Sequence, residues 1–122
     1  ETLWATELEA TDYYATPALF EGILYVVSAK GVFAALDAET GKIHYRKKLQ
    51  AGGNIYASPI VAGGHIYVSG SHGEVWVFKA GPDGALVSEN SFRDRVWSSP
   101  FVEGGALYIR GEGFLYCIGA SR

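Results

Sequence analysis

Three segments of the chain align with one another almost without gaps, and this internal repeat limits the possible folds more than any other feature. The segments cover residues 14–36, 56–78 and 97–118. The prolines in them lie 42 and 41 residues apart, the tyrosines 42 and 41, and the glycines 42 and 40 (Pro17, Pro59, Pro100; Tyr25, Tyr67, Tyr108; Gly31, Gly73, Gly113). A period of about 41 residues that holds several strands is typical of the blades of a β-propeller.

The strands within each repeat follow from turn glycines and from the composition. Sixteen glycines and 14% aromatic residues favour short strands joined by tight turns, so we predict an all-β fold. The proline marks the entry of the first strand, as in residues 57–61, because proline is tolerated near a strand start. Further strands are expected at residues 23–27, 65–69 and 106–110, at 32–36, 74–78 and 114–118, and at 42–49 and 85–91. We therefore predict four-stranded antiparallel blades, with repeats at about 14–49, 56–92 and 97–122.

The third repeat lacks a fourth strand, and the first eight residues match the missing one. Residues 1–8 align with residues 42–49, so that Trp4 matches Tyr45 and Leu8 matches Leu49. We expect residues 1–8 to form the outermost strand of a blade, which would remove an exposed sheet edge. Propellers have about four to eight blades. The chain is therefore either a fragment of a larger propeller or closes by association of copies, two of which would give a six-bladed ring.

The sharpest turn signal lies at residues 37–41, between two apolar runs. Asp37 and Thr40 can accept hydrogen bonds from nearby backbone amides, and Gly41 can adopt a positive φ without steric cost. The pattern predicts a hairpin at this point.

Residues 35–45 read ALDAETGKIHY and resemble the AxDxxTGxxxW docking motif of repeats in pyrroloquinoline quinone (PQQ) enzymes. The positions that carry the resemblance are Ala35, Asp37, Thr40, Gly41 and Tyr45, with Trp4 at the place that matches Tyr45. Tyrosine replaces the usual tryptophan at position 45, and the second copy, at residues 77–84, is degenerate. In the family this motif locks neighbouring blades together without contacting the cofactor, so the resemblance implies a fold and no chemistry.

The family has two functional branches. Quinoprotein dehydrogenases hold PQQ and Ca²⁺ over the axis with an Asp base and often adjacent cysteines, whereas this chain has Cys117 alone. The BamB-like branch presents the propeller as a surface for other proteins. We expect a non-catalytic, BamB-like scaffold for protein binding or ligand presentation, periplasmic or otherwise extracytoplasmic, with no cofactor. The alternatives are part of a PQQ- and Ca²⁺-dependent dehydrogenase, or a carbohydrate-binding propeller that would use Tyr13 and Trp97.

Other functional classes lack their usual signals. A net charge of −3 gives no basic face for nucleic acid, and no run of apolar residues is long enough to cross a membrane. His44, His65 and His72 lie on different strands or turns, so we expect no metal site. No nucleophile or acid-base pattern is present, and we expect no catalytic residue.

Binding residues are expected in the loops that surround a propeller axis. These are residues 9–13, 50–55 and 90–96, together with three turns between strands. Asp12, Asn54 and Arg95 each stand two residues before the aromatic residue that opens a repeat, so we expect them at equivalent places. Arg93, Asp94 and Arg95 form the preferred contact loop. The full candidate set for a ligand or partner is Asp12, Lys30, Asn54, His72, Arg93, Asp94, Arg95 and Glu112.

Overall fold

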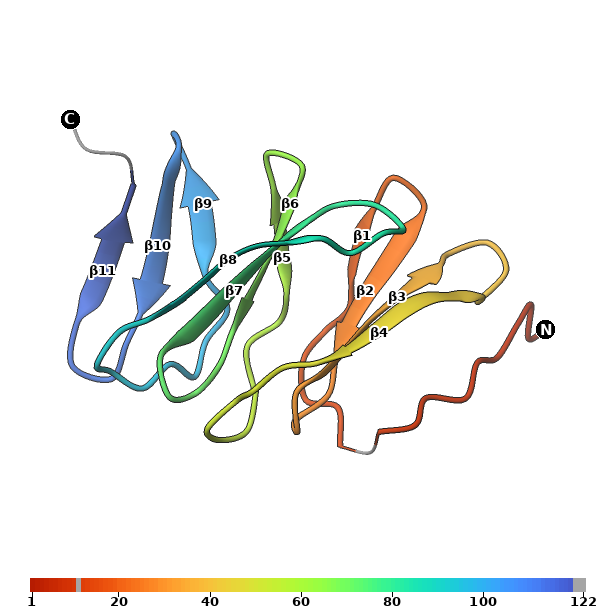
Figure 1. Cartoon of the computed structure of the whole chain (residues 1–122), viewed down its shortest axis with the longest axis horizontal. Helices are drawn as coiled ribbons and strands as arrows, with labels where there is room; N and C mark the ends of the chain where they lie inside the picture. The colour runs from red at the N-terminus through yellow and green to blue at the C-terminus, as the bar shows by residue number, and fades with distance from the viewer. Residues whose placement is uncertain (11, 120–122) are drawn as a thin grey trace.

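The computed structural model describes residues 1–10 and 12–119. These residues form eleven β-strands in three antiparallel sheets, and none of them lies in a helix. The three sheets stand side by side along the long axis of the molecule (Figure 1). Within each sheet, consecutive strands are joined by short connections and pair with each other, as the glycine-rich composition predicts.

Each sheet corresponds to one sequence repeat. The first contains β1 (Ala18–Phe20), β2 (Ile23–Val27), β3 (Val32–Asp37) and β4 (Ile43–Lys48) in that order. The second contains β5 (Ile60–Ala62), β6 (His65–Ser69), β7 (Glu74–Lys79) and β8 (Leu86–Ser91). The third contains β9 (Phe101–Glu103), β10 (Ala106–Arg110) and β11 (Leu115–Ile118). The prediction of an all-β fold with two complete four-stranded sheets and a shorter third one is confirmed.

The first strand of each repeat begins later than the sequence predicts. In the second sheet we expected residues 57–61, whereas β5 covers Ile60–Ala62. Pro59 has no N–H for a ladder hydrogen bond, and the N–H of Ser58 donates instead to Ser99 Oγ at 2.9 Å. Thr16 N donates to Ser58 Oγ in the same way, at 2.8 Å. The residues before the proline therefore link neighbouring sheets and do not extend a strand.

The expected strand at residues 1–8 is not formed in the structure. The physical reason is that no strand among the described residues lies beside this segment to exchange backbone hydrogen bonds with it. Residues 4–10 nevertheless alternate between half-buried and exposed, which is the burial pattern of a half-covered strand.

The main hydrophobic core lies between the first and second sheets. Tyr25, Phe33 and Phe78 are almost completely buried there, and the rings of Phe33 and Phe78 stack with centroids 4.6 Å apart. A smaller cluster of Val75, Val96 and Ile109 joins the second sheet to the third. The apolar contact is therefore strongest between the first two repeats and weaker at the third.

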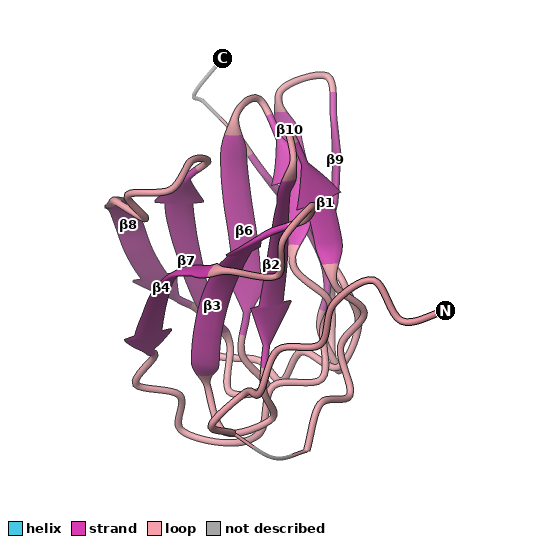
Figure 2. Cartoon of the chain, turned by 90° about the vertical axis from the view of Figure 1, so that its right-hand side faces the viewer, coloured by secondary structure: helices cyan, strands magenta, loops and turns pink. Residues whose placement is uncertain are grey.

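The connections between sheets gather at one end of the strands, which Figure 2 shows below the sheets. We call this the loop end and define it by residues 28–31, 49–55, 70–73, 92–96 and 111–114. Backbone hydrogen bonds join neighbouring sheets here, because Ile55 N donates to Ala29 O at 2.8 Å and Val96 N donates to Ser71 O at 3.1 Å. The loop end is thus fixed to the strands by repeated contacts and not only by chain connectivity.

Candidate functional site

The turn at residues 37–41 is built around the Asp37 carboxylate. Its Oδ1 accepts hydrogen bonds from Thr40 N at 2.8 Å, from Glu39 N at 2.9 Å and from Thr40 Oγ1 at 3.0 Å. The bonds from Thr40, followed by that from Glu39, lower the pKa of Asp37 below its ordinary value because they favour the ionised form. These contacts are all local, so this carboxylate serves the turn.

Trp4 packs against the glycine that ends this turn. Gly41 has φ of 77°, and a Cβ at this position would meet the indole ring of Trp4. Trp4 Nε1 also donates to Ala38 O at 3.1 Å, and Thr6 Oγ1 donates to Gly41 O. An aromatic ring from one segment thus covers a glycine of the next, with the indole N–H fixing its direction.

Tyr45 makes the same contact one repeat later. Gly84 has φ of 64°, and a Cβ there would lie 2.5 Å from Tyr45 Cζ. Gly81 N donates to Tyr25 OH at 2.9 Å, so a hydrogen bond accompanies this packing contact between the first two repeats. Burial, followed by the neighbouring Tyr25, raises the pKa of the Tyr45 hydroxyl well above its ordinary range.

The structure therefore places Tyr45 at a contact between the first two sheets, and Gly41 at a contact with Trp4 of the N-terminal segment. Sequence reasoning missed Gly81 and Gly84, because the motif of the second repeat is degenerate in its other positions. The signal that could have found them is the retained glycine at the end of the turn, which aligns with Gly41. We call the pairs Trp4–Gly41 and Tyr45–Gly84 the aromatic-on-glycine contacts.

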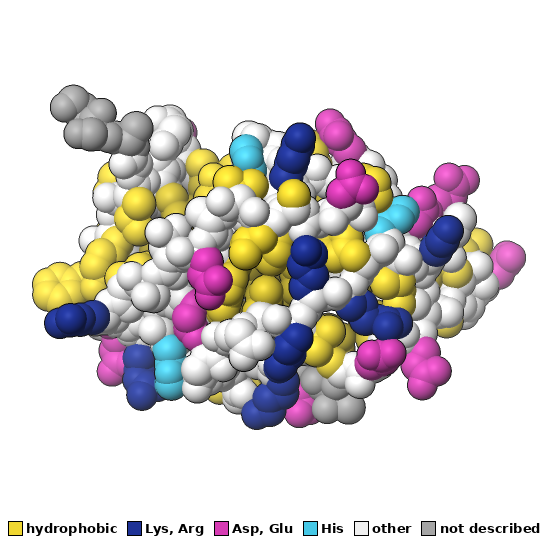
Figure 3. All heavy atoms as spheres, viewed as in Figure 1, with side chains coloured by type: hydrophobic (Ala, Val, Ile, Leu, Met, Phe, Trp, Pro, Cys, Tyr) yellow, Lys and Arg dark blue, Asp and Glu magenta, His cyan; other side chains and the backbone are white. Residues whose placement is uncertain are grey.

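The loop end carries the candidate binding site. Arg93, Asp94, Arg95, His72 and Glu112 line a hollow of about 430 Å³. The first three come from the connection between the second and third sheets, His72 from the turn between β6 and β7, and Glu112 from the turn between β10 and β11. The space-filling view shows histidine, acidic and basic side chains together along this end of the molecule (Figure 3).

Asp94 holds this loop against the third sheet. Its carboxylate accepts hydrogen bonds from Tyr116 OH at 3.0 Å, from Gly113 N at 3.1 Å and from Phe114 N at 3.2 Å. Partial burial raises the pKa of Asp94, but the hydrogen bonds from Tyr116, Gly113, Arg95 and Phe114 outweigh it and keep the pKa below its ordinary value. A carboxylate with this many donors is a positioning group for the loop.

The two arginines beside Asp94 are exposed. The only ion pair among the described residues joins Arg46 to Glu9 at 2.9 Å, so neither Arg93 nor Arg95 belongs to one there. An arginine presents several N–H donors in a planar arrangement that suits carboxylates. The loop thus presents two cationic groups on a backbone that Asp94 fixes.

The other candidate residues take equivalent backbone positions but do not share this hollow. The carbonyl oxygens of Asp12, Asn54 and Arg95 each accept a hydrogen bond from a turn amide of their own repeat, at 2.7, 3.3 and 2.8 Å. Lys30 Nζ donates to Asn54 Oδ1 at 2.9 Å, which forms a separate polar pair beside the second sheet. Asp12 has φ of 60° and does not line the hollow.

The aromatic residues that open the three repeats form a row of rings, of which the sequence analysis named only Trp97 as a possible contact. Tyr14 and Tyr56 stack with centroids 5.4 Å apart, and Tyr56 and Trp97 lie 5.4 Å apart with tilted planes. The three side chains are 59%, 36% and 48% exposed. The signal was their shared position at the start of each repeat. Trp97, which the carbohydrate alternative would use, packs against Tyr56 in this row.

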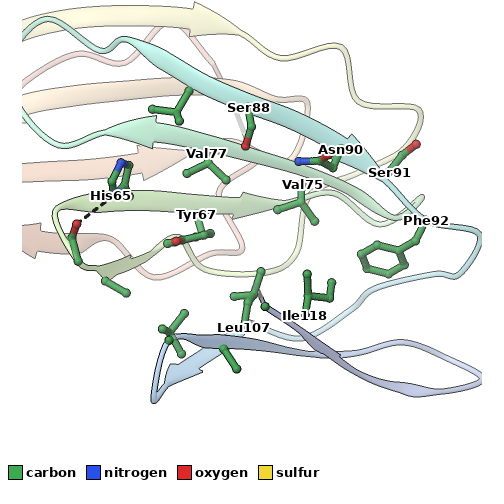
Figure 4. A pocket seen from close by; sticks show the side chains of 17 residues that line it. His65, Tyr67, Val75, Val77, Ser88, Asn90, Ser91, Phe92, Leu107 and Ile118 are labelled. Atoms are coloured by element: carbon green, nitrogen blue, oxygen red, sulfur yellow. Dashed lines mark hydrogen bonds between the residues drawn. The ribbon is translucent and has the colours of Figure 1, made fainter. Parts of the chain in front are cut away.

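An apolar cavity of about 850 Å³ lies between the second and third sheets. Ser88 stands there at the position that Tyr45 holds one repeat earlier, and Val75 at the position of Phe33. Figure 4 shows Val75, Val77 and Ser88 on one side and Leu107 and Ile118 on the other. Smaller side chains at repeat-equivalent positions account for the weaker contact between these sheets.

The described residues were compared with the Ca²⁺ ligands that a quinoprotein dehydrogenase requires. Within residues 1–10 and 12–119, no group of three His, Cys, Asp or Glu side chains could hold a metal ion. Two carboxylates in this region already accept backbone N–H groups: Asp94 accepts from Gly113 N, and Glu74, the first residue of β7, accepts from Gly52 N at 2.6 Å. The described part of the chain also forms no helix of the length and hydropathy that a membrane span requires.

A family model supplies the decisive comparison. The model described as outer membrane protein assembly factor BamB, of the PQQ repeat type, matches residues 1–87. The chain belongs to this family. A search of curated protein sequences gives no match. The family assignment agrees with the resemblance of the docking motif.

Solved structures of BamB and of quinohemoprotein alcohol dehydrogenases are similar in fold to this chain. BamB from Moraxella catarrhalis superimposes with a TM-score of 0.78 at 17% identity, covering 96% of this chain and 36% of that protein. A quinohemoprotein alcohol dehydrogenase from Pseudomonas putida gives 0.68 at 20% identity, covering 88% and 18%. The corresponding enzyme from Comamonas testosteroni gives 0.63 at 21%, covering 80% and 17%. At these identities the likeness shows the fold, so the three sheets are propeller blades, and the chain spans about a third or less of these proteins.

Proposed function

We propose that this chain is part of a non-catalytic propeller that binds other proteins through its loop end. The observation that carries the proposal is the Arg93-Asp94-Arg95 loop. The Asp94 carboxylate bonds the loop to the turn of blade 3, while both arginines remain exposed beside it. Binding residues on loops that a rigid scaffold positions are a common arrangement in binding proteins.

The chemistry of the loop end favours an acidic partner surface. Arginine and aromatic residues are enriched in protein interfaces, and the exposed row of Tyr14, Tyr56 and Trp97 lies at the starts of the same repeats. Exposed guanidinium groups bind carboxylates with two hydrogen bonds each. An acidic peptide, or an acidic surface patch on a folded partner, would supply carboxylates for both arginines.

Family membership suggests where this partner acts. The matching family model is described as an outer membrane protein assembly factor, so we propose an extracytoplasmic location and a partner involved in assembling outer membrane proteins. A scaffold of this kind needs no catalytic carboxylate. This agrees with the carboxylates of Asp94 and Glu74, which both accept hydrogen bonds from backbone N–H groups.

The test is affinity capture from detergent-solubilised bacterial envelopes, followed by binding measurements with the purified captured protein. The binding variant is Arg93→Ala/Arg95→Ala, and the matched control is Lys79→Ala, which removes an exposed cation away from the hollow. We expect at least a tenfold loss of affinity for the first variant and no change for the second. Equal affinity of all three proteins would refute the assignment to the loop end.

The dehydrogenase alternative makes different predictions. For this test the protein is expressed with PQQ and Ca²⁺ and then purified. A dehydrogenase would retain the absorbance of the quinone and would reduce an artificial electron acceptor. The proposal predicts neither, because the described residues do not supply a ligand set. Acceptor reduction that depends on added PQQ would replace the scaffold proposal with an enzyme.

A further inference from the structure

The turn that carries His72 is held between two connections of the loop end. Ser71 N donates to Asn54 O at 3.3 Å, and Ser71 O accepts from Val96 N at 3.1 Å. One bond therefore joins the turn to the connection between blades 1 and 2, and the other joins it to the connection between blades 2 and 3. Because blade 2 has both of its neighbours in the chain, these contacts need no further blade.

The imidazole ring of His72 rests on a pair of glycines. A Cβ at Gly52 would lie 2.7 Å from Nδ1 of the ring, and a Cβ at Gly53 would lie 2.8 Å from Nε2. The backbone N–H of His72 donates to Glu74 Oε1 at 3.0 Å, and the same carboxylate accepts from Gly52 N. Residues 50–55 carry no charged side chain, so Glu74 is the charged group on this side of the turn. The glycine pair makes room for the ring, and His72 at the same time lines the hollow.

The turn position of His72 carries a different charge in each blade. It is Lys30 in blade 1 and Glu112 in blade 3. The Lys30 ammonium donates to Asn54 Oδ1 at 2.9 Å, whereas His72 and Glu112 both line the hollow. Blade 2 therefore has, at this position, the one side chain of the three that changes its charge near neutral pH.

The other charges of the hollow cancel. Its lining residues are His72, two arginines and two carboxylates, so its formal charge is zero while His72 is neutral (Arg93 and Arg95; Asp94 and Glu112). Arginine and carboxylate groups in contact with water keep their charges between about pH 5.5 and about pH 8, whereas histidine gains a proton over this range. Protonation of His72 therefore makes the hollow net positive.

We propose that His72 is a further contact of the loop end for the acidic partner, and that its protonation makes this binding depend on pH. The inference rests on the proposed function, because it requires a partner carboxylate beside Arg93 and Arg95. A protonated imidazole donates a charge-assisted hydrogen bond to such a carboxylate, which is stronger than the bond from a neutral ring. Binding is therefore tighter at acid pH than at neutral pH.

Glu112 has the opposite effect in the same hollow. Its side chain is exposed there, and a carboxylate repels the carboxylates of an acidic partner. Its charge does not change over the range in which His72 gains a proton. Removal of this charge therefore strengthens binding at both ends of the range and leaves the dependence on pH in place.

The test measures how tightly the protein binds a hexa-aspartate peptide at pH 7.5 and at pH 5.5. The peptide carries a rhodamine label that is insensitive to pH, and fluorescence anisotropy is recorded at one low ionic strength. Aspartate stays ionised at both pH values, so the peptide keeps its charge. For the unmodified protein we expect the affinity to rise about twofold to fivefold at pH 5.5, which is the effect of one added exposed charge pair.

Substitutions at position 72 separate charge from shape. His72→Gln keeps a hydrogen-bonding side chain without the charge, so we expect the affinity of the unmodified protein at pH 7.5 and no gain at pH 5.5. His72→Arg carries a permanent charge, so we expect tight binding at both pH values. Glu112→Gln should bind more tightly than the unmodified protein at both and keep the gain at acid pH.

His65→Gln is the matched control in the same blade. The His65 ring contacts Gly63 O at 2.9 Å, in the turn before β6, and does not line the hollow (Figure 4). We expect this variant to keep the full dependence on pH. Circular dichroism at both pH values checks that all variants fold alike.

The outcomes separate this inference from the proposed function. An unchanged pH dependence in His72→Gln would overturn the role of His72, even where Arg93→Ala/Arg95→Ala abolishes peptide binding. If the unmodified protein binds the peptide at neither pH, or if the double arginine variant binds it equally well, an acidic partner at the loop end is contradicted and this inference fails with it.

Discussion

Replacement of Gly84 by alanine tests the aromatic-on-glycine contact between blades 1 and 2. Gly84 is buried with φ of 64°, and an added Cβ would lie 2.5 Å from Cζ of Tyr45. A non-glycine residue in the left-handed region costs about 1–2 kcal/mol. Forcing an extra methyl group against a packed ring costs a further ~1–3 kcal/mol. We therefore expect Gly84→Ala to lower the free energy of unfolding by about 2–5 kcal/mol.

Gly63 provides a matched control in the same chain. It has φ of 54°, close to that of Gly84, but a Cβ there would meet no atom within 4 Å. Gly63→Ala should therefore cost only the backbone part, about 1–2 kcal/mol. The difference between the two variants isolates the contact with Tyr45, because the effect of alanine on the unfolded chain is shared.

The assay is urea denaturation followed by tryptophan fluorescence, with the midpoint and slope compared between variants. In a Tyr45→Ala background, Gly84→Ala should cost no more than Gly63→Ala does, since the ring it would strike is gone. Equal losses for Gly84→Ala and Gly63→Ala in the unmodified protein would refute the proposed contact.

Two further predictions concern single polar contacts. Tyr25→Phe leaves Gly81 N without its acceptor at 2.9 Å, so we expect a loss of about 1–3 kcal/mol in urea denaturation and faster hydrogen exchange of the Gly81 amide. The folded state lowers the pKa of Asp37, so its contribution to stability is complete above the ordinary value of 3.8 and is lost as pH falls through the lower folded value. Melting temperatures measured from pH 7 to pH 2.5 should therefore fall at the acid end, and less steeply in Asp37→Asn; identical acid profiles would contradict the assigned role.

The sequence predicts most of the fold because its markers repeat with a fixed period. Strands at residues 23–27, 65–69 and 106–110 are confirmed at the predicted bounds, since a glycine turn limits each of them. The entry strands are shorter than predicted because Ser58 and Thr16 use their N–H groups in bonds between blades. Such contacts depend on which repeats become neighbours, and a single repeat does not reveal them.

The candidate site was only partly predictable from sequence. The equivalence of Asp12, Asn54 and Arg95 follows from repeat spacing, and their carbonyl oxygens do take matching hydrogen bonds. The gathering of His72 with Arg93 was expected from propeller geometry, whereas the repeat pattern does not reveal that Asp12, Lys30 and Asn54 stay outside the hollow. Residues 1–8 form no strand in the described structure, because a strand requires a neighbour as well as a suitable pattern; that they complete a blade stays a prediction.

The central functional claim is that the loop end binds an acidic protein surface through Arg93 and Arg95. The most direct measurement is the dissociation constant of the captured partner by titration calorimetry at low and at physiological salt. We predict that binding weakens with salt in the unmodified protein, and that Arg93→Ala/Arg95→Ala loses both affinity and most of this salt dependence. Lys79→Ala should bind as the unmodified protein does. Unchanged affinity and unchanged salt dependence in the double variant would contradict the claim.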